Sequence, residues 1–492
     1  MVFIDGTVVN VALPALQRAL GATLGEAQWV VEAYELMLAA LLLVGGAAGD
    51  RFGRRRVFAI GVVVFTVASI ICGLSDRVAT LIAGRSLQGV GGALLVPGSL
   101  ALLSASFDTQ RRGRAIGVWS GFTAMTAALG PVVGGFLIDH GSWRYAFFLN
   151  VPLALAVLVL TFRYVPESRG ESSDDRIDWL GAVLAAAGLG GIVYALIEAP
   201  FIGSTVTMLG SLALGICVLL VFLVVEWRHR SPMLPLQLFR SPDFAGANLL
   251  TLLLYAALGG SLFFFPLNLI QVQGYSTLQA GAALLPLVLL MFVLSRWAAG
   301  LVERHGAKLP LIVGPAIAAC GFALFALPGA GGSYWATFFP AALVLGLGMT
   351  LTVAPLTTTV MQSVAPEKIG VASGVNNAVS SVAGLLAIAG FGMVMSRTFD
   401  DDLSARLAAA SLPPQIVAAV DSQRAKLAAI DVPSNASPEV RAAIESAVAA
   451  AFVSGFRRVM AISTLLAVAS AASAWLMIGH GRQMRPHARD RT

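Results

Sequence analysis

The chain has 492 residues, of which 57% are hydrophobic and only 12% are charged, and its mean hydropathy is +0.83. A soluble globular protein carries about 25% charged residues, so this composition excludes that class and predicts a polytopic protein embedded in a lipid bilayer. The net charge of +6 does not indicate a nucleic-acid partner, because the basic residues are dispersed over short loops.

Apolar runs bounded by charged residues or by Gly and Pro divide the chain. Each is long enough to cross a hydrocarbon core of roughly 30 Å as a helix. The expected fold class is therefore an all-α polytopic membrane protein with about 14 transmembrane helices. The runs are 1–20, 27–49, 57–75, 78–104, 114–138, 145–165, 178–200, 205–226, 243–270, 277–300, 309–328, 334–360, 368–396 and 457–479.

The first run contains Asp5, carries no Lys or Arg before it, and shows no small-residue cleavage site. We therefore do not expect a signal peptide. Because this run is short on its amino-terminal side, we expect the natural first helix to begin several residues earlier.

A dense cluster of charge separates the second run from the third. Glycine permits a tight turn there, and arginine next to an apolar helix is typical of a cytoplasmic loop. The cluster consists of Gly49, Asp50, Arg51, Phe52, Gly53, Arg54, Arg55 and Arg56.

Basic residues are distributed unevenly over the predicted loops. If the amino end is inside, twenty of the thirty-two Lys and Arg fall in cytoplasmic loops and tails. This bias predicts a multi-pass protein of a bacterial inner membrane with both termini cytoplasmic. It also places the long Ala-rich segment 397–456 outside, where we expect short amphipathic helices over the outer face and a helix start at Ser437.

An internal repeat appears when the chain is aligned with itself at an offset of 253 positions, so that 50–55 matches 303–308 and 117–121 matches 370–374. Parallel six-helix repeats with a binding site at their interface are a transporter architecture. We predict an N-terminal six-helix bundle, an inserted helix pair with cytoplasmic linkers, a C-terminal six-helix bundle that includes the outer loop, and a cytoplasmic tail. Their bounds are 1–165, 166–242, 243–479 and 480–492.

Four motifs in order resemble the major facilitator superfamily, and within it the fourteen-helix drug:proton antiporter family. The loop cluster 49–55 is similar to the superfamily's loop 2–3 signature. The other three are similar to the family's first-helix, fourth-helix and fifth-helix antiporter motifs and span 4–14, 85–92 and 130–135.

Arg85 and Asp5 are the candidate proton-coupling residues. A guanidinium inside an apolar helix costs several kcal/mol unless it is paired or faces a wet cavity. The resemblance implies a role for Arg85 in proton transfer, with Gln88 on the same helix face, and Asp5 is the matching acid. The alternatives are an Arg85 bonded to backbone carbonyls and an Asp5 that faces the cytoplasm.

The fifth-helix motif places Gly130, Pro131, Gly134 and Gly135 on adjacent turns. Small residues permit close helix approach, and proline permits a kink. The resemblance implies that this motif helps to seal the outer side in antiporters, and it implies a conformational latch for the loop cluster Gly49, Asp50, Arg51, Gly53, Arg54 and Arg55. The alternative for the fifth-helix motif is generic packing of small residues. The alternative for the loop cluster is a signal that only orients the protein in the membrane.

Other polar and aromatic residues could line a substrate cavity. Glu32 and Glu35 share a face of the second run and could attract cations, take protons or simply be solvated. Aromatic groups could bind flat lipophilic compounds or face lipid. These further candidates are Gln88, Tyr255, Phe263 and Asn268.

The predicted function is proton-coupled export of small lipophilic, cationic drugs by alternating access. The rivals are an exporter of one dedicated metabolite or siderophore, and a non-transporting sensor. The sequence contains no Gly-x-x-x-x-Gly-Lys-Ser/Thr run, which would indicate an ATPase. We therefore expect neither an enzyme nor a cofactor. Cys72, Cys217 and Cys320 lie in apolar runs, so neither a disulfide nor a metal site is expected. We expect a monomer and leave open a periplasmic adaptor with an outer-membrane channel.

Overall fold

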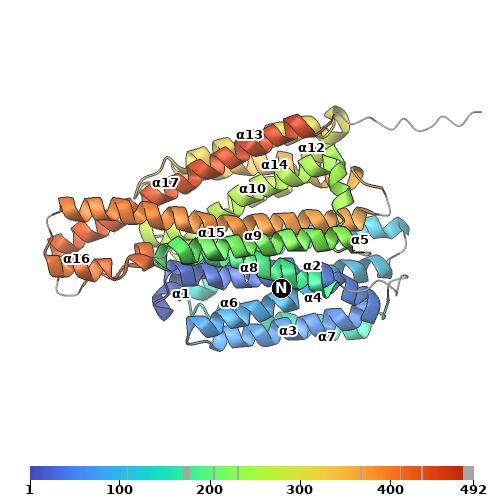
Figure 1. Ribbon diagram of the computed structural model, residues 1–492, viewed down its shortest axis with the longest axis horizontal. Helices are drawn as coiled ribbons and strands as arrows, with labels where there is room; N and C mark the ends of the chain where they lie inside the picture. The colour runs from blue at the N-terminus through green and yellow to red at the C-terminus, as the bar shows by residue number, and fades with distance from the viewer. Residues whose placement is uncertain are drawn as a thin grey trace, which may run out of the picture.

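The computed structural model describes residues 1–107, 109–169, 178–202, 205–229, 232–365, 368–410, 412–433 and 436–479. Every regular element within these ranges is helical (Figure 1). The predicted linker 166–177 is therefore only partly covered, and the predicted tail 480–492 lies outside the described residues.

The helices follow the predicted runs closely. The first group comprises α1 (Val2–Leu20), α2 (Leu24–Phe52), α3 (Arg54–Leu74), α4 (Val78–Ser106), α5 (Thr109–Asp139), α6 (Tyr145–Phe148) and α7 (Asn150–Tyr164). The central pair comprises α8 (Trp179–Ile202) and α9 (Thr205–Arg228). The last group comprises η1 (Leu236–Arg240), α10 (Pro242–Leu267), the π-helical η2 (Asn268–Val272), α11 (Thr277–Ala282), α12 (Leu285–His305), α13 (Lys308–Phe325), α14 (Phe338–Gln362), α15 (Ile369–Ala409), α16 (Pro414–Asp421), η4 (Arg424–Ala429) and α17 (Pro438–Met477).

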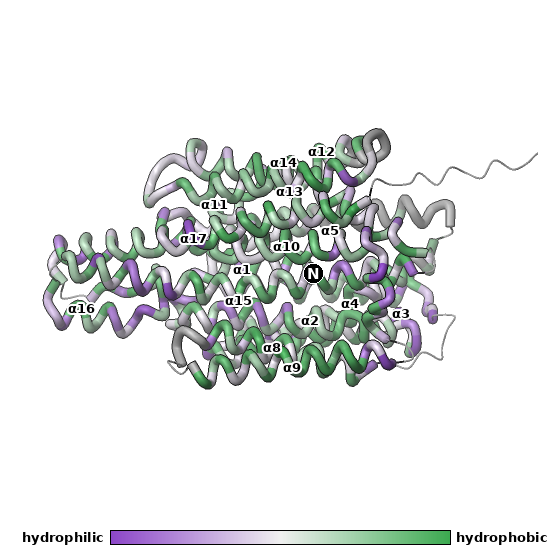
Figure 2. Tube along the Cα trace, turned by 45° about the horizontal axis from the view of Figure 1, so that its top comes forward, coloured by the Kyte–Doolittle hydropathy of each residue, from purple (hydrophilic) through white to green (hydrophobic). Residues whose placement is uncertain are grey.

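Twelve helices of the described residues, rather than the predicted fourteen, are long and apolar enough to cross a membrane. The two runs that fall short are those of α1 and α5. The 19 residues of α1 include the polar Asp5, Gln17 and Arg18. In α5 only Met125–Asp139 forms an apolar stretch. Both runs form helices all the same, and Figure 2 shows apolar residues along most of the helices with polar residues gathered at their ends.

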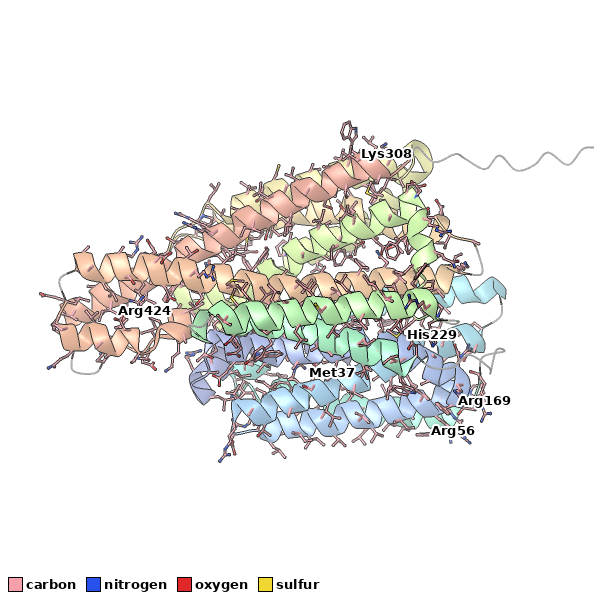
Figure 3. All side chains as sticks on the ribbon, in the orientation of Figure 1. Met37, Arg56, Arg169, His229, Lys308 and Arg424 are labelled. Carbon is pink, nitrogen blue, oxygen red and sulfur yellow. The ribbon has the colours of Figure 1, made fainter. Side chains whose placement is uncertain are left out.

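The two ends of the helical assembly are distinct. We call the end at which α1 stops and α2 begins, near α16, the hairpin end, and the end at which α2 stops and α3 begins the linker end. Figure 3 shows Arg424 at the hairpin end, and Arg56, Arg169 and Lys308 at the linker end. Within each helix group neighbours pack closely: α2 and α3 against α4, α1 against α5, and α10 against α15 and α17.

The segment 397–456 differs from its prediction. Instead of short helices lying over the outer face, α15 and α17 continue as helices of 41 and 40 residues and project together beyond the other helices (Figure 1). At about 1.5 Å per residue each is roughly 60 Å long, twice a bilayer core. Alanine has the highest helix propensity, so a fall in hydropathy does not end these helices.

The start of α17 agrees with its predicted signal, since the Ser437 hydroxyl accepts a hydrogen bond from the Val440 amide. The return between α15 and α17 is made by α16 and η4. The latter lies against α1, α2 and η2. Leu427 of η4 is buried there and is the one non-glycine among the described residues with positive φ, at 52°.

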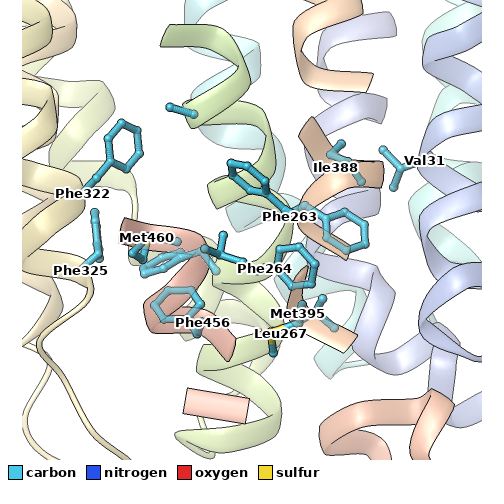
Figure 4. Close-up of a cluster of buried hydrophobic side chains, with 14 of the residues drawn as sticks. Val31, Phe263, Phe264, Leu267, Phe322, Phe325, Ile388, Met395, Phe456 and Met460 are labelled. Atoms are coloured by element: carbon cyan, nitrogen blue, oxygen red, sulfur yellow. The ribbon is translucent and has the colours of Figure 1, made fainter. Parts of the chain in front are cut away.

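The aromatic core lies in the last helix group. Figure 4 shows Phe263, Phe264 and Leu267 of α10 near Met395 of α15 and Phe456 of α17. The Phe263 and Phe264 rings meet edge to face, with centroids 4.9 Å apart. Packed aromatic side chains thus fill the space between these helices.

Candidate functional site

Asp5 of α1 and Arg85 of α4 form a buried ion pair. The Arg85 Nη1 donates to the Asp5 Oδ2 at 2.5 Å, and both side chains are at most 1% exposed. The fold thus brings the two candidate coupling residues together, and the alternative of an Asp5 open to solvent does not describe this structure. Breaking such a buried pair typically costs about 3–5 kcal/mol, because it leaves one charge uncompensated.

Three further polar side chains complete the surroundings of the Asp5 carboxylate. Gln88 lies between the two ions, accepting from Arg85 Nη1 at 2.8 Å and donating to Asp5 Oδ1 at 3.1 Å. Asn150, at the start of α7, donates to the same oxygen at 2.8 Å. Ser69 of α3 accepts from Gln88 at 2.8 Å. Four helices therefore supply one connected network, which we call the Asp5 network: Asp5, Ser69, Arg85, Gln88 and Asn150.

The guanidinium is held from a second side by α2. Its Nε donates to the Val30 carbonyl at 2.9 Å, and its centre lies 4.2 Å from the centroid of the Tyr34 ring. The backbone contact raised as an alternative role is therefore present together with the ion pair. It fixes the guanidinium plane while leaving Nη1 to bind Asp5 and Gln88.

Glycines of the fourth-helix motif allow this arrangement. A Cβ at Gly91 would lie 2.6 Å from the Phe65 amide nitrogen of α3, and one at Gly89 would contact the Tyr34 carbonyl of α2. Only glycine permits such close helix approach. The spacing of the motif thereby brings α4, and Arg85 with it, against both neighbours.

The loop cluster at the linker end forms a tight junction. Gly53 has φ 111°, which favours glycine, and a Cβ there would lie 3.0 Å from the Glu167 carboxylate. That carboxylate accepts from the Arg55 amide at 2.9 Å and lies 3.7 Å from Arg56. Asp50 pairs with Arg54 at 2.7 Å. Glu167, which the sequence did not suggest, thus anchors the segment after α7 to this turn.

Two of the predicted latch residues make no side-chain bond in that junction. Arg51 is exposed, and its guanidinium lies over the ring of neighbouring Phe52. Gly49 lies inside α2, with its carbonyl accepting from the Gly53 amide at 3.0 Å. The observed bonds join α2, α3 and the end of α7 within one helix group.

The fifth-helix motif lies where α5 meets α1 and α11. A Cβ at Gly130 would overlap Thr7, and one at Gly134 would lie 2.6 Å from Val8 Cγ1. One at Gly135 would lie 2.6 Å from Leu278 Cα. Pro131 contributes its carbonyl, against which Gly281 of α11 packs. Gly130 and Gly134 therefore pack α5 against α1 within the first helix group, whereas Pro131 and Gly135 form a seam between α5 and α11 of the last group.

Hydrogen bonds between these two groups gather at the hairpin end. The Asp139 carboxylate at the end of α5 accepts from the Thr277 and Leu278 amides, at 3.0 and 2.8 Å. Gln271 of η2 donates to Gln17 of α1 at 2.9 Å. The described part of the chain thus shows a conformation in which the two groups are joined at the hairpin end.

The two acidic residues of α2 differ in environment. Glu32 is 0% exposed, and neither carboxylate oxygen has a hydrogen-bond partner among the described residues. Glu35, three residues later on the same helix, is partly exposed. The alternative of two solvated residues therefore does not fit Glu32.

The remaining cavity candidates belong mainly to packed structure. Phe263 is 1% exposed and part of the aromatic core, so it faces neither lipid nor an open cavity here. Asn268 is buried and accepts from Gln273 at 3.2 Å. Tyr255 is partly buried against the core. A cavity lined by these side chains would require another conformation of the helices.

Sequence reasoning missed Ser69, Asn150, Tyr34 and Glu167 as parts of these sites. Single polar residues in apolar helices carry no spacing signal, and Glu167 lies in a polar linker. Asparagine at the start of α7 was the one available hint, because a buried amide needs partners.

The comparisons with known proteins agree on the family. The Major Facilitator Superfamily profile matches residues 1–388. The chain is 34% identical over 484 residues, covering 96% of this chain and 88% of the relative, to the tetracenomycin C resistance and export protein of Streptomyces glaucescens. It is 35% identical over 407 residues, covering 80% and 74%, to the multidrug resistance protein Stp of Mycobacterium tuberculosis. It is 37% identical over 393 residues, covering 79% and 78%, to the puromycin resistance protein pur8 of Streptomyces alboniger.

Solved structures show the same fold at lower identity. A bacterial homologue of the human lysosomal transporter Spinster, in an inward-facing and unoccupied conformation, has a TM-score of 0.63 and 18% identity over 96% of this chain and 93% of that chain. The xylose transporter XylE of E. coli, in its inward-open conformation, has a TM-score of 0.58 and 14% identity over 98% and 94%. The chain is a membrane transporter and not an enzyme, and it belongs to the Major Facilitator Superfamily.

Proposed function

We propose that this protein exports small lipophilic antibiotics or drugs in exchange for protons. The observation that carries the proposal is the buried Asp5–Arg85 pair, since a membrane-buried carboxylate and guanidinium mark an ion pathway by default. The named relatives support export, because tetracenomycin C and puromycin resistance proteins are among them.

Protonation of Asp5 would weaken its attraction to Arg85 and leave the guanidinium with Gln88 and the Val30 carbonyl. A change of about 1–3 kcal/mol shifts a two-state equilibrium by about ten- to a hundredfold. Substrate and proton can therefore compete for one conformational equilibrium without touching the same atom. Each proton entering down the membrane potential contributes about 2.3 kcal/mol per 100 mV, so no ATP is required.

The proposed orientation places the hairpin end outside and the linker end, with its arginines, in the cytoplasm. Under this proposal α1 and α5 also cross the membrane, as in the fourteen-helix antiporters, and both termini are cytoplasmic. The conformation described here would be closed to the outside, and opening would require the α5 seam to separate from α11. The working unit would be a monomer.

The proposal includes a preference for cationic substrates. Its basis is the pair of carboxyls on α2, Glu32 and Glu35, on the same face of the helix. The second candidate function is export of one dedicated antibiotic, which the single-drug relatives favour.

The test is efflux of a lipophilic cationic dye and of puromycin from energised cells that produce the protein. We expect both to leave faster than from cells that produce the Asp5→Asn variant, and a protonophore should abolish the difference. Protonophore-resistant efflux would contradict proton coupling. Export of puromycin alone would support the dedicated exporter.

A further inference from the structure

Glu32 has a feature that the Asp5 network does not explain. It is completely buried, and both its oxygens lack a hydrogen-bond partner within the described residues. An isolated ionised carboxylate in such surroundings is so unfavourable that the group takes a proton instead. By contrast, the buried Asp5 is bonded to a guanidinium and two amides.

The position of Glu32 follows from its neighbours on α2. Gln28 lies one turn before it and Leu36 one turn after it, so the three side chains share a face. Gln28 donates to the Ile388 carbonyl of α15 at 2.6 Å, and Leu36 packs in a cluster with Leu385 of the same helix. Figure 4 shows Val31 facing Ile388. Glu32 therefore lies where the first helix group closes on α15.

No positive charge is available to Glu32 at this interface within the described residues. The basic residues of η4, which packs against α2, are bound elsewhere: Arg424 pairs with Asp421 at 2.8 Å and Lys426 with Asp431 at 3.5 Å. The part of α15 from 369 to 396 contains no charged residue. The one charged residue of α8 is Glu198, which accepts from Trp29 at 3.2 Å. Glu35, three residues further along α2, is a second carboxyl, and the Arg85 guanidinium is already bound to Asp5.

We propose that Glu32 is a second proton-binding site, which must be protonated for the α2–α15 interface to close. When the groups separate at the hairpin end, water would reach Glu32 and let it ionise. When they close, the proton would be carried inside with the carboxyl. A drug molecule does not fit this role in the closed state, because the side chain is fully enclosed by packed residues. This inference rests on the proposed proton coupling and adds a second titrating carboxyl to it.

The closing experiment reads conformation without transport. Ile388→Cys places a thiol on α15 beside the interface, and a membrane-impermeant maleimide is applied to purified protein between pH 5 and 9, with peptide mapping to count label at that position. A maleimide reacts with the thiolate, so labelling at each pH is expressed relative to that of the same protein after denaturation. We expect this ratio to rise at least fivefold with pH in the otherwise unchanged protein, because ionised Glu32 favours separation. With Glu32→Gln added, the rise of this ratio should fall to the part that titration of Asp5 contributes, which is less than half of the rise in the unchanged protein. Glu445→Gln, an exposed carboxyl on α17, is the matched control and should behave as the unchanged protein.

Two results would overturn the proposal: a Glu32→Gln protein whose labelling still rises with pH as in the control, or a control protein that shows no pH dependence. Glu32→Met provides a second variant of similar length. If Glu32 only binds a proton and has no hydrogen-bond partner, the thermal unfolding midpoint of the Glu32→Met protein should equal or exceed that of the unchanged protein. If Glu32 has a structural hydrogen-bonding role, the midpoint of the variant should be lower. Failure of dye efflux would refute the exporter proposal and leave these conformational readouts unaffected.

Discussion

The side-chain amide of Gln28 and the backbone carbonyl of Ile388 are joined by a hydrogen bond of 2.6 Å that crosses from α2 to α15. The two residues are far apart in sequence, and Gln28 lies one helical turn from the buried Glu32. A hydrogen bond of this kind contributes about 0.5–1.5 kcal/mol. It therefore belongs to the small set of contacts that can bias the closed conformation.

Gln28→Leu should loosen that closure while keeping most of the side chain's bulk. We expect the maleimide labelling at Ile388→Cys to increase about two- to tenfold at constant pH, in line with the loss of one hydrogen bond. Gln362→Leu, on the exposed linker-end turn of α14, is the control and should leave labelling unchanged. Equal labelling in the two variants would show that the Gln28 bond has no part in closure.

Arg85→Lys should abolish export at unchanged protein level. An ammonium cannot donate at once to Asp5, Gln88 and the Val30 carbonyl in the fork geometry of a guanidinium. Dye efflux should fall at least tenfold relative to the unchanged protein. Arg441→Lys, on the projecting part of α17, serves as the control because its contacts lie outside the site. Near-normal efflux in the Arg85→Lys protein would show that only the positive charge of Arg85 is needed, and not its fork geometry.

Gly135→Ala should obstruct the seam between α5 and α11. The new methyl group would meet the Leu278 backbone at 2.6 Å, and overpacking of this kind costs about 1–3 kcal/mol. We expect a shift away from the conformation closed at the hairpin end, seen as increased labelling at Ile388→Cys and reduced efflux. Gly390→Ala is the matched control, since a methyl group added there would meet no atom of another helix within 4 Å. Indistinguishable behaviour of the two variants would refute the seam's role.

The proposed orientation can be tested by cysteine accessibility in intact cells. Ser422→Cys, exposed next to α16, should react with an impermeant maleimide from outside. Ser106→Cys, at the linker end of α4, should react only after the cells are opened. The reverse pattern would invert the topology and with it the direction of export.

Much of the helical architecture could be predicted from the sequence, because a bilayer demands long apolar helices and the runs record them. The Asp5–Arg85 pairing could also be anticipated, since Asp5 is the lone acid of the first apolar run and Arg85 the lone charge of its own. The projecting ends of α15 and α17 could not be read from hydropathy, because Ala-rich helices persist where hydropathy falls. The difference in burial between Glu32 and Glu35 could not be predicted either, because it depends on how α15 packs against α2.

Protonation of Asp5 is the step that, in our proposal, couples the proton to substrate binding. Other titratable groups near it are Tyr34 and Glu35 of α2 and Cys72 of α3, so the Glu35→Gln variant is included as a comparison. The most direct measurement is the affinity of the purified protein for an exported dye between pH 5 and 9. If protons and substrate compete through Asp5, affinity should weaken about tenfold or more as pH falls. Asp5→Asn should lose most of this dependence and keep only the part that Glu32 contributes, and Glu35→Gln should retain it. An Asp5→Asn protein with the full pH dependence of the unchanged protein would contradict coupling through this carboxyl.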